Sequence, residues 1–143
     1  MAGVRLEEVY DALRDADDDE DELESRAAAL KAAQRAEVAR VGGYLLASSE
    51  VGSWDAVAAN ALVRAGADVA VVGTERSDAA RMSLRASARV RGLHLGELAN
   101  EVGRALGWSG GGHEGAAGLR GAPPLAPAKA RMLDALRARL EAS

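Results

Sequence analysis

Residues 43–72 read GYLLASSEVGSWDAVAANALVRAGADVAVV, and this stretch decides the fold. The apolar run at 43–48 predicts a short buried strand, and the unbroken apolar run at 69–72 predicts a strand that is covered on both faces. Apolar residues at helical spacing lie between them, after Ser53, which can cap a helix, and before Gly66, which can end one. This order of elements predicts a βαβ unit with parallel strands and a right-handed crossover.

The segments that follow extend the predicted sheet and add helices to it. Residues 80–87 alternate in polarity after a polar turn, which predicts an antiparallel neighbour of the strand at 69–72. Apolar spacing predicts further helices at 95–106 and, after the prolines, at 132–140. The expected fold class is therefore α/β: a small mixed sheet with a right-handed βαβ unit, an antiparallel hairpin strand and flanking helices, preceded by an N-terminal helical segment. The alternation places Met82, Leu84 and Ala86 on one face of their strand and Arg81, Ser83 and Arg85 on the other.

Residues 1–40 are expected to form a helical lead-in to a domain at 41–143. An amphipathic helix at 6–13 and an alanine-rich helix at 24–40 flank an acidic run at 15–24. The run holds eight acidic side chains in ten positions, and their repulsion predicts a solvated, disordered linker that is dispensable for folding. A calcium loop is the alternative, but it requires a turn glycine, and the run has none.

Composition excludes several functional classes. A chain of 143 residues is one ordinary domain, and without cysteine it has no disulfide, thiolate metal site or cysteine nucleophile. No apolar run approaches the roughly 20 residues of a membrane helix, so we expect a cytoplasmic protein without membrane contact. Half of the 22 acidic residues lie within the first 24 positions, so the remainder of the chain is basic.

The glycine-rich stretch Ser109–Gly118, SGGGHEGAAG, is the strongest candidate for a binding site. Three consecutive glycines leave backbone N–H groups unshielded, and a short helix beginning near His113 would direct its positive end to the same place. This arrangement predicts an anion site, most often for phosphate. A flexible surface turn is the alternative. The other histidine, His94, is expected to lie on the surface or to cap a helix.

Three more specific motifs could be assigned to the glycine-rich stretch, and each lacks a feature that the motif requires. The dinucleotide pattern Gly-x-Gly-x-x-Gly is present, but it follows a predicted helix instead of a strand. A Walker loop requires Lys-Ser or Lys-Thr after the glycines, and neither follows them. A metalloprotease HExxH motif requires a second histidine where this chain has Ala117, so a zinc site is not expected.

The string GGGHEGAAG at 110–118, with RMSLRAS at 81–87, resembles the DHH-associated domain of the DHH phosphoesterases. The resemblance covers about residues 41–120 and keeps the order of strand, helix and glycine loop. This group includes RecJ-like single-strand exonucleases and enzymes that degrade very short oligonucleotides. The related domain that ends alanyl-tRNA synthetases resembles this chain less, because its glycine loop lacks the histidine followed by the alanine pair.

The resemblance implies a domain that binds the phosphates or bases of a substrate and presents them to a separate catalytic domain. That catalytic domain carries an Asp-His-His motif and manganese ligands, and no such triplet occurs in this chain. We therefore expect the chain to bind no cofactor or metal and to be non-catalytic alone, with manganese in a partner or missing catalytic domain. The substrate-contacting residues that the resemblance implies are Ser83, Arg85, Gly110, Gly111, Gly112 and His113.

Two departures from the family pattern are small. The chain has Ser109 where the loop often has a fourth glycine, and Ala86 separates Arg85 from Ser87. Neither change removes a charged group or the glycine triplet. Both are expected to be tolerated.

Two functions remain open on the sequence alone. The first is a nucleic-acid or nucleotide phosphate-binding module of a RecJ-like DHH phosphoesterase, with single-stranded nucleic acid or a short oligonucleotide as its ligand. In this hypothesis Arg85 and His113 bind one phosphate, and Arg81, Arg89 or Arg91 are further candidates. The second is a non-catalytic structural or regulatory subunit of a larger nucleic-acid-processing assembly, joined to a DHH catalytic domain or another subunit through its terminal helices. The ligand class stays open between DNA, RNA and a dinucleotide.

Overall fold

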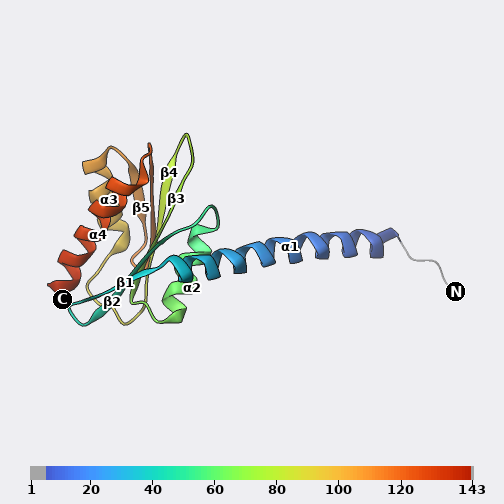
Figure 1. Cartoon of the computed structure of the whole chain (residues 1–143), viewed down its shortest axis with the longest axis horizontal. Coiled ribbons are helices and arrows are strands. Elements are labelled where there is room, and N and C mark those ends of the chain that lie inside the picture. Colours follow the sequence, from blue (N-terminus) through green and yellow to red (C-terminus); the bar gives the residue numbers. More distant parts are fainter. Residues whose placement is uncertain (1–5, 143) are drawn as a thin grey trace.

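The computed structural model describes residues 6–142, with side chains from residue 19 onward. Within this range a six-stranded sheet in the order β1-β2-β3-β4-β6-β5 is flanked by four helices (Figure 1). This agrees with the α/β class and the mixed sheet expected from the sequence. In chain order the elements are α1 (Leu6–Arg35), β1 (Glu37–Val41), β2 (Tyr44–Glu50), α2 (Asp55–Ala65), β3 (Val69–Glu75), β4 (Ala80–Ala86), α3 (Leu95–Leu106), β5 (Ser109–Gly112), β6 (Ala116–Gly121) and α4 (Leu125–Glu141).

The predicted βαβ unit is confirmed. Strands β2 and β3 pair in parallel with α2 between them, and β4 returns antiparallel to β3. Gly66 ends α2 as predicted, whereas Ser53 does not cap its start. Trp54 occupies the cap position instead, with a left-handed backbone (φ 64°) and no side-chain cap hydrogen bond.

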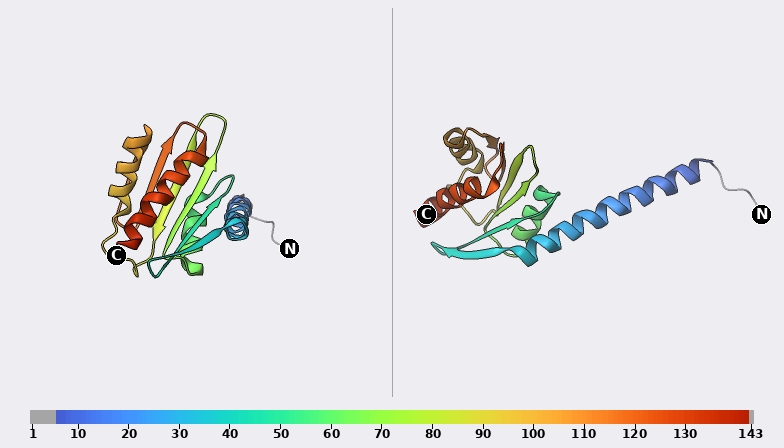
Figure 2. Two further views of the ribbon diagram at one scale, coloured as in Figure 1. Left: turned by 60° about the vertical axis from the view of Figure 1, so that its left-hand side comes forward. Right: turned by 45° about the horizontal axis from the view of Figure 1, so that its top comes forward.

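The helices cover the two faces of the sheet unequally. Helices α3 and α4 lie on one face, where Met82, Leu84 and Leu136 are fully buried in the main core. On the other face α2 packs on β3 and β4, and α1 packs on α2, where Ala32 and Ala58 are fully buried. The ribbon views show α3 and α4 on one side of the sheet and α1 and α2 on the opposite side (Figures 1 and 2). Strands β6 and β5 continue the sheet beyond β4.

Three strands differ from the sequence-based expectation. Strand β1 occupies positions where the alanine-rich helix was expected to continue to residue 40, because Gly42 (φ +58°) and Gly43 (φ +90°) make a tight turn that pairs β1 with β2. Strands β5 and β6 form a hairpin where a loop and a short helix were expected. Pairing with β4 and packing of α3 supply the stability that glycine lacks as a strand former.

The acidic run at 15–24 is helical, so the expectation of a disordered linker there is wrong. A single helix, α1, includes the run and projects away from the sheet (Figure 1). Its C-terminal part is anchored, because Ala28 and Ala32 are buried and the Ser49 hydroxyl donates to the Ala32 carbonyl at 2.7 Å. Once a helix is anchored, adding further residues to it costs little free energy, because the unfavourable nucleation step is already complete. The Glu, Ala and Leu residues of the run are also good helix formers.

Helix α3 packs on the bare backbone of β5. A Cβ on Gly110 would collide with the carbonyl oxygen of Ala99, and a Cβ on Gly96 would collide with that of Gly112. Gly111 faces the other way, and a Cβ there would meet nothing within 4 Å. Gly110 therefore permits the close approach of α3, whereas Gly111 leaves the opposite face of the strand bare.

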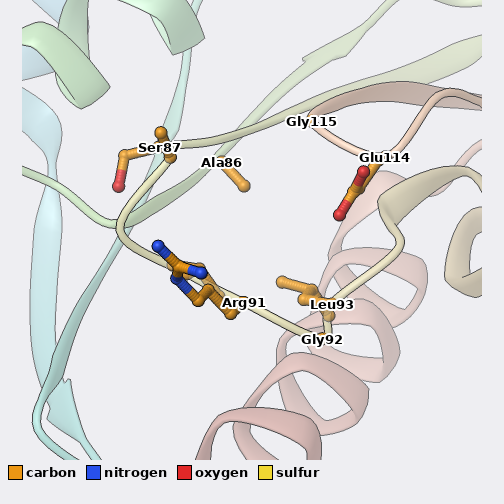
Figure 3. A pocket seen from close by; sticks show the side chains of 9 residues that line it. Ala86, Ser87, Arg91, Gly92, Leu93, Glu114 and Gly115 are labelled. Carbon is orange, nitrogen blue, oxygen red and sulfur yellow. The ribbon is translucent and has the colours of Figure 1, made fainter.

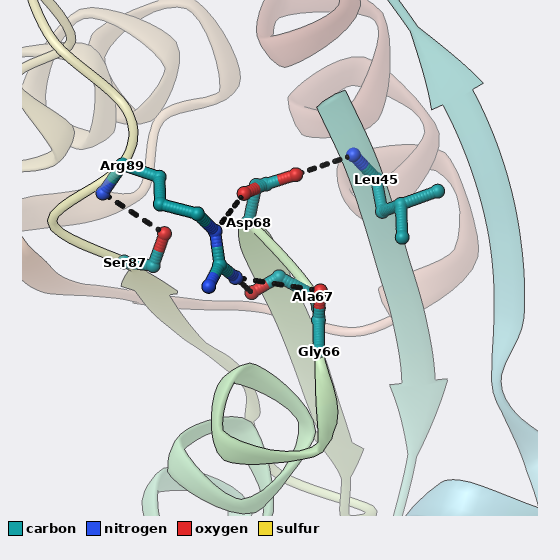
Figure 4. A network of polar contacts seen from close by, with 6 residues as sticks. All are labelled: Leu45, Gly66, Ala67, Asp68, Ser87 and Arg89. Atoms are coloured by element: carbon teal, nitrogen blue, oxygen red, sulfur yellow. Dashed lines mark hydrogen bonds and ion pairs between the residues drawn. The ribbon is translucent and has the colours of Figure 1, made fainter. Parts of the chain in front are cut away.

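Asp68 fastens the start of β3 to β2 and to the segment after β4 (Figure 4). Its Oδ2 accepts the Leu45 N–H at 2.8 Å, and its Oδ1 accepts Arg89 Nε at 2.7 Å. Arg89 also donates to the carbonyl oxygens of Gly66 and Ala67. Burial acts to raise the pKa of the Asp68 carboxyl, but the bonds from Arg89 and Leu45 outweigh burial and hold that pKa below its ordinary value of 3.8.

Asp68→Asn should lower the free energy of unfolding at pH 7 by about 1 to 2 kcal/mol, because it removes a charged acceptor from a buried network. Since folding lowers the pKa of Asp68, its contribution is complete above the unfolded-state value and is lost as the pH falls through the folded-state value. The difference between parent and variant should therefore shrink on acidification. Urea unfolding at pH 7 and pH 3 measures it, and an equal difference at both pH values would contradict the assignment.

Gly110→Ala should lower the free energy of unfolding by about 1 to 3 kcal/mol, because the new methyl group must displace α3 from β5. Gly111→Ala is the matched control, since its methyl group meets no atom of the chain, and its stability should change by less than about 0.5 kcal/mol. Urea unfolding compares the two variants with the parent. Equal losses at both positions would show that α3 does not require the bare backbone.

Candidate functional site

One face of strands β4, β6 and β5 forms a continuous surface, and α2 covers the part of this surface that lies over β4. Residues directly opposite each other on antiparallel strands point to the same face, so the register identifies the set that shares this surface. Ser83 identifies the face, because its hydroxyl donates to Asp55 at the start of α2. We call this surface the open strip. It comprises Arg81, Ser83, Arg85, Ser109, Gly111, Ala116, Gly118 and Arg120.

The middle row of the open strip has almost no side chains. Ser83 lies opposite Gly118, and Gly118 lies opposite Gly111. A Cβ on Gly118 would come within 3.3 Å of the Met82 carbonyl oxygen, and one on Gly111 would stand in open space. A groove of about 350 Å³ lies over this row. A ligand in the groove would therefore rest on backbone atoms.

At one end of the groove, buried Asp55 orients Arg81 and Ser83. Its Oδ1 accepts Arg81 Nη2 at 2.7 Å, and its Oδ2 accepts Arg81 Nε at 3.2 Å and the Ser83 hydroxyl at 2.5 Å. The Asp55 side chain is 5% exposed, whereas that of Arg81 is 48% exposed. The two-point contact holds the plane of the guanidinium, so Arg81 presents a fixed positive group at the rim of the groove.

Arg85 lies at the other end of the open strip and is half-buried. Its Nη1 donates to the carbonyl oxygens of Leu84 at 2.8 Å and Ala117 at 3.4 Å. Within the described part of the chain it forms no ion pair. Carbonyl groups orient the guanidinium without cancelling its charge, so this end of the strip carries a full positive charge that suits an anion.

No helix begins at His113, so that part of the sequence-based prediction is wrong. Strand β5 ends at Gly112, and the chain turns back into β6. The turn instead caps α3: Gly96 N–H donates to the His113 carbonyl at 2.9 Å, and Leu95 N–H donates to the Glu114 carbonyl at 3.0 Å. The helix N-terminus beside the turn is that of α3. Its first N–H groups bond to carbonyl groups of the turn, so they are not available to an anion.

His113 and Arg85 both neighbour Ala116. The His113 N–H donates to the Ala116 carbonyl at 2.7 Å, and Ala116 lies opposite Arg85 in the sheet. The imidazole is exposed. The register thus brings the two residues that were expected to share a phosphate to the same end of the open strip.

A hollow of about 620 Å³ opens beyond this end, beside the turn (Figure 3). Leu93 contributes an apolar wall, and Arg91 and Glu114 lie on opposite sides. Arg91, one of the candidate phosphate contacts, therefore lines this hollow and not the groove. Arg89, another candidate, is engaged by Asp68.

His94 and Trp108, which flank α3 and the glycine run, have structural roles. His94 caps α3, as expected, with Nδ1 accepting the Glu97 N–H at 3.1 Å. Trp108 packs against the main core, and its ring occupies the space that a Cβ on Gly121 would need. The aromatic side chain next to the glycine run is therefore not part of the open strip.

The predicted site residues do not all share one face of the sheet. Ser83, Arg85 and Gly111 belong to the open strip, and His113 lies at its end. The other two glycines of the run face α3 and the hairpin turn, where a Cβ would collide with backbone atoms. The structure thus brings four of the six together.

Two residues of this site were missed by sequence reasoning. Arg120 lines the groove, and Asp55 orients two groove residues. The alternation within 116–121 carries a signal for Arg120, but it becomes visible only once that segment is known to be a strand. Asp55 has no such signal, because its contact with β4 depends on tertiary packing.

The described residues contain no group of three or more His, Asp or Glu side chains that could hold a metal ion. No helix in residues 6–142 is both long enough and apolar enough to cross a membrane.

Sequence comparison relates the chain to a known domain family. Residues 42–142 match the family model described as the DHHA1 domain. The uncharacterized protein MJ0988 of Methanocaldococcus jannaschii is 40% identical over 105 residues, which cover 70% of this chain and 31% of that protein. The chain thus spans less than a third of the length of this relative.

Solved structures share the fold at low sequence identity. The C-Ala domain of Aquifex aeolicus alanyl-tRNA synthetase matches with a TM-score of 0.61 at 19% identity, over 73% of this chain and 98% of that one. The DHH domain protein PF0399, described as a member of the s1p family of ribosomal proteins, matches at 0.58 and 13%, over 84% and 31%. The pGpG-specific phosphodiesterase PggH of Vibrio cholerae matches at 0.52 and 16%, over 82% and 39%. Because the family model covers most of the chain and these structures share its fold, the chain belongs to the DHHA1 domain family, the DHH-associated domains.

Proposed function

We propose that this chain is the nucleic-acid or nucleotide phosphate-binding module of a RecJ-like DHH phosphoesterase, of the single-strand exonuclease or short-oligonucleotide phosphodiesterase type. The observation that carries the proposal is the Arg85 end of the open strip. A half-buried guanidinium lies there beside the His113 turn, and no carboxylate among residues 19–142 neutralises it. A half-buried guanidinium that no carboxylate neutralises attracts phosphate more strongly than a fully solvated one.

In this proposal Arg85 and His113 bind the same phosphate. The guanidinium presents several donors in a fixed plane that matches phosphate oxygens, and the imidazole adds a donor from the turn. Gly111 and Gly118 form the floor of the groove, which we call the glycine floor. It lets a sugar or a base lie against the strand backbone. Phosphate contacts position a strand without reading its sequence, which suits a domain that presents many sequences for cleavage.

Cleavage in this proposal belongs to a separate DHH domain that holds manganese, supplied by a partner or by another part of a longer protein. Two of the structural matches are named as a DHH domain and as a pGpG-specific phosphodiesterase. The second name specifies a dinucleotide and supports a short ligand. DNA, RNA and dinucleotide ligands are to be distinguished by binding measurements.

A second candidate function is that of a structural or regulatory subunit. It is favoured by α1, which projects from the domain (Figure 1) and leaves Leu23 58% and Leu30 69% exposed. Residues seven positions apart share one face of a helix, so these two leucines offer a surface that another protein can cover. Binding of nucleic acid by the chain distinguishes the two functions, since the second does not require an occupied open strip.

Arg85→Ala and His113→Ala should each weaken binding of a labelled single-stranded oligonucleotide, by about 10-fold for the arginine and about 3-fold for the histidine. The double variant should lose less than the product of the single losses, because both side chains act on one phosphate. Arg85→Ala should also reduce the salt slope of log K by about 0.7, the value for one contact to a single strand. Fluorescence anisotropy with DNA and RNA of equal length, over a salt series, measures these effects.

Arg131→Ala is the matched control for charge, because it removes an exposed arginine from α4 on the opposite face of the sheet. Its affinity should stay within about 2-fold of the parent, and all variants should keep the parent melting temperature. If Arg85→Ala and His113→Ala bind as the parent does, or fail only because they unfold, the phosphate assignment is wrong and the subunit function takes its place.

The purified chain should release no mononucleotides from single-stranded DNA or RNA, with or without added manganese. The physical reason is that the chain lacks the Asp-His-His ligands that would hold a metal-activated water. Chromatographic separation of the products after long incubation measures this. Release that a chelator abolishes and that persists through further purification would contradict the prediction.

A further inference from the structure

The end of the open strip farthest from His113 carries two arginines directly opposite each other. Arg81 on β4 lies opposite Arg120 on β6, so both side chains leave the sheet on the same face. Like charges at directly opposed positions destabilise a pair of strands. Asp55 pairs with only one of these two arginines, so a bound anion would reduce the repulsion that remains between them.

The chain supplies one carboxylate to the two guanidinium groups. Asp55 engages Nε and Nη2 of Arg81, which leaves the Nη1 group of that side chain for a further acceptor. Arg120 is exposed, and within residues 19–142 it has no side-chain hydrogen bond or ion pair. The pair of arginines with Asp55 keeps a net positive charge beside the groove.

The groove opens between these two arginines. Arg81, Arg120 and Ser109 line it together with the glycine floor, and Ser109 lies opposite Arg120 on β5. A phosphate at this place would meet two guanidinium groups and a hydroxyl. All three groups are donors, which is the set that phosphate oxygens accept.

We propose that Arg81 and Arg120 form a second phosphate site, so that the open strip binds an oligonucleotide backbone of several nucleotides in preference to a lone nucleotide. This rests on the proposed function, in which Arg85 and His113 hold a first phosphate. Arg81 and Arg85 are four residues apart on β4, so the two sites lie roughly 13 Å from each other. One phosphate cannot contact both, whereas a backbone that follows β4 contacts each with a different phosphate.

Arg120→Ala tests the second site and leaves Asp55 with its own partner. Substitution of Arg81 would instead leave the buried Asp55 carboxylate without its guanidinium partner. The two probes are a labelled single-stranded hexanucleotide and guanosine 5′-monophosphate. Arg120→Ala should weaken hexanucleotide binding about 3- to 10-fold and leave the monophosphate within about 2-fold, whereas Arg85→Ala should weaken both. The control Arg131→Ala should change neither.

Two further readouts separate a binding role from a structural one. The double variant Arg85→Ala/Arg120→Ala should lose hexanucleotide affinity by the product of the single losses, because sites this far apart without a shared partner act independently. The melting temperature of Arg120→Ala should equal or exceed that of the parent, because the substitution removes a like-charge pair.

The outcomes distinguish the second site from the function on which it rests. An Arg120→Ala variant that binds the hexanucleotide as tightly as the parent overturns the second site. One that loses hexanucleotide and monophosphate equally overturns it as well, because both ligands then use one site. If Arg85→Ala binds both probes as the parent does, the proposed function itself fails.

Discussion

The packing of α3 on the bare backbone of β5 is the contact on which the rest of the domain depends. Neither Gly96 nor Gly110 has room for a Cβ, so the helix lies directly on the strand. The same approach lets the carbonyl groups of His113 and Glu114 cap the first turn of α3. The β5–β6 hairpin is thus held from one side. Its other side needs no helix for stability, which is why a groove can remain there.

Two buried carboxylates lie at opposite ends of the β3–β4 hairpin. Each pairs with an arginine, but the two ion pairs have different roles. Asp68 holds Arg89, which is further engaged by two backbone carbonyl groups, so that pair fastens strands together. Asp55 holds Arg81 by two points and leaves the remaining nitrogen of the guanidinium at the rim of the groove. Both arginines donate through Nε and Nη2, so the two ion pairs differ in what the guanidinium joins: Arg89 links Asp68 to the backbone before β3, whereas Arg81 bonds to Asp55 alone and lines the groove.

The sequence predicted the elements whose patterns are local. The apolar runs and helical spacing of 43–72 were sufficient for the parallel unit, and the alternation at 80–87 placed Ser83 and Arg85 on the correct face. The strand at 109–112 could not be recognised, because glycines carry no side-chain pattern and its pairing depends on α3. Charge repulsion in the run at 15–24 predicts disorder, but helix elongation from an anchored end outweighs that repulsion. Without the hairpin register, nothing in the sequence places Arg120 opposite Arg81.

The glycine run illustrates how packing and binding can be separated on one strand. Gly110 must lack a side chain because α3 occupies that space, and Gly112 has a positive φ of 145° and would collide with Ala117. Gly111 meets neither requirement, since a Cβ there would stand in open space and its backbone is not left-handed. The fold alone therefore accounts for two of the three glycines. The proposed function gives a reason for the third, because a methyl group at that position would project into the groove and hold a ligand away from the strand.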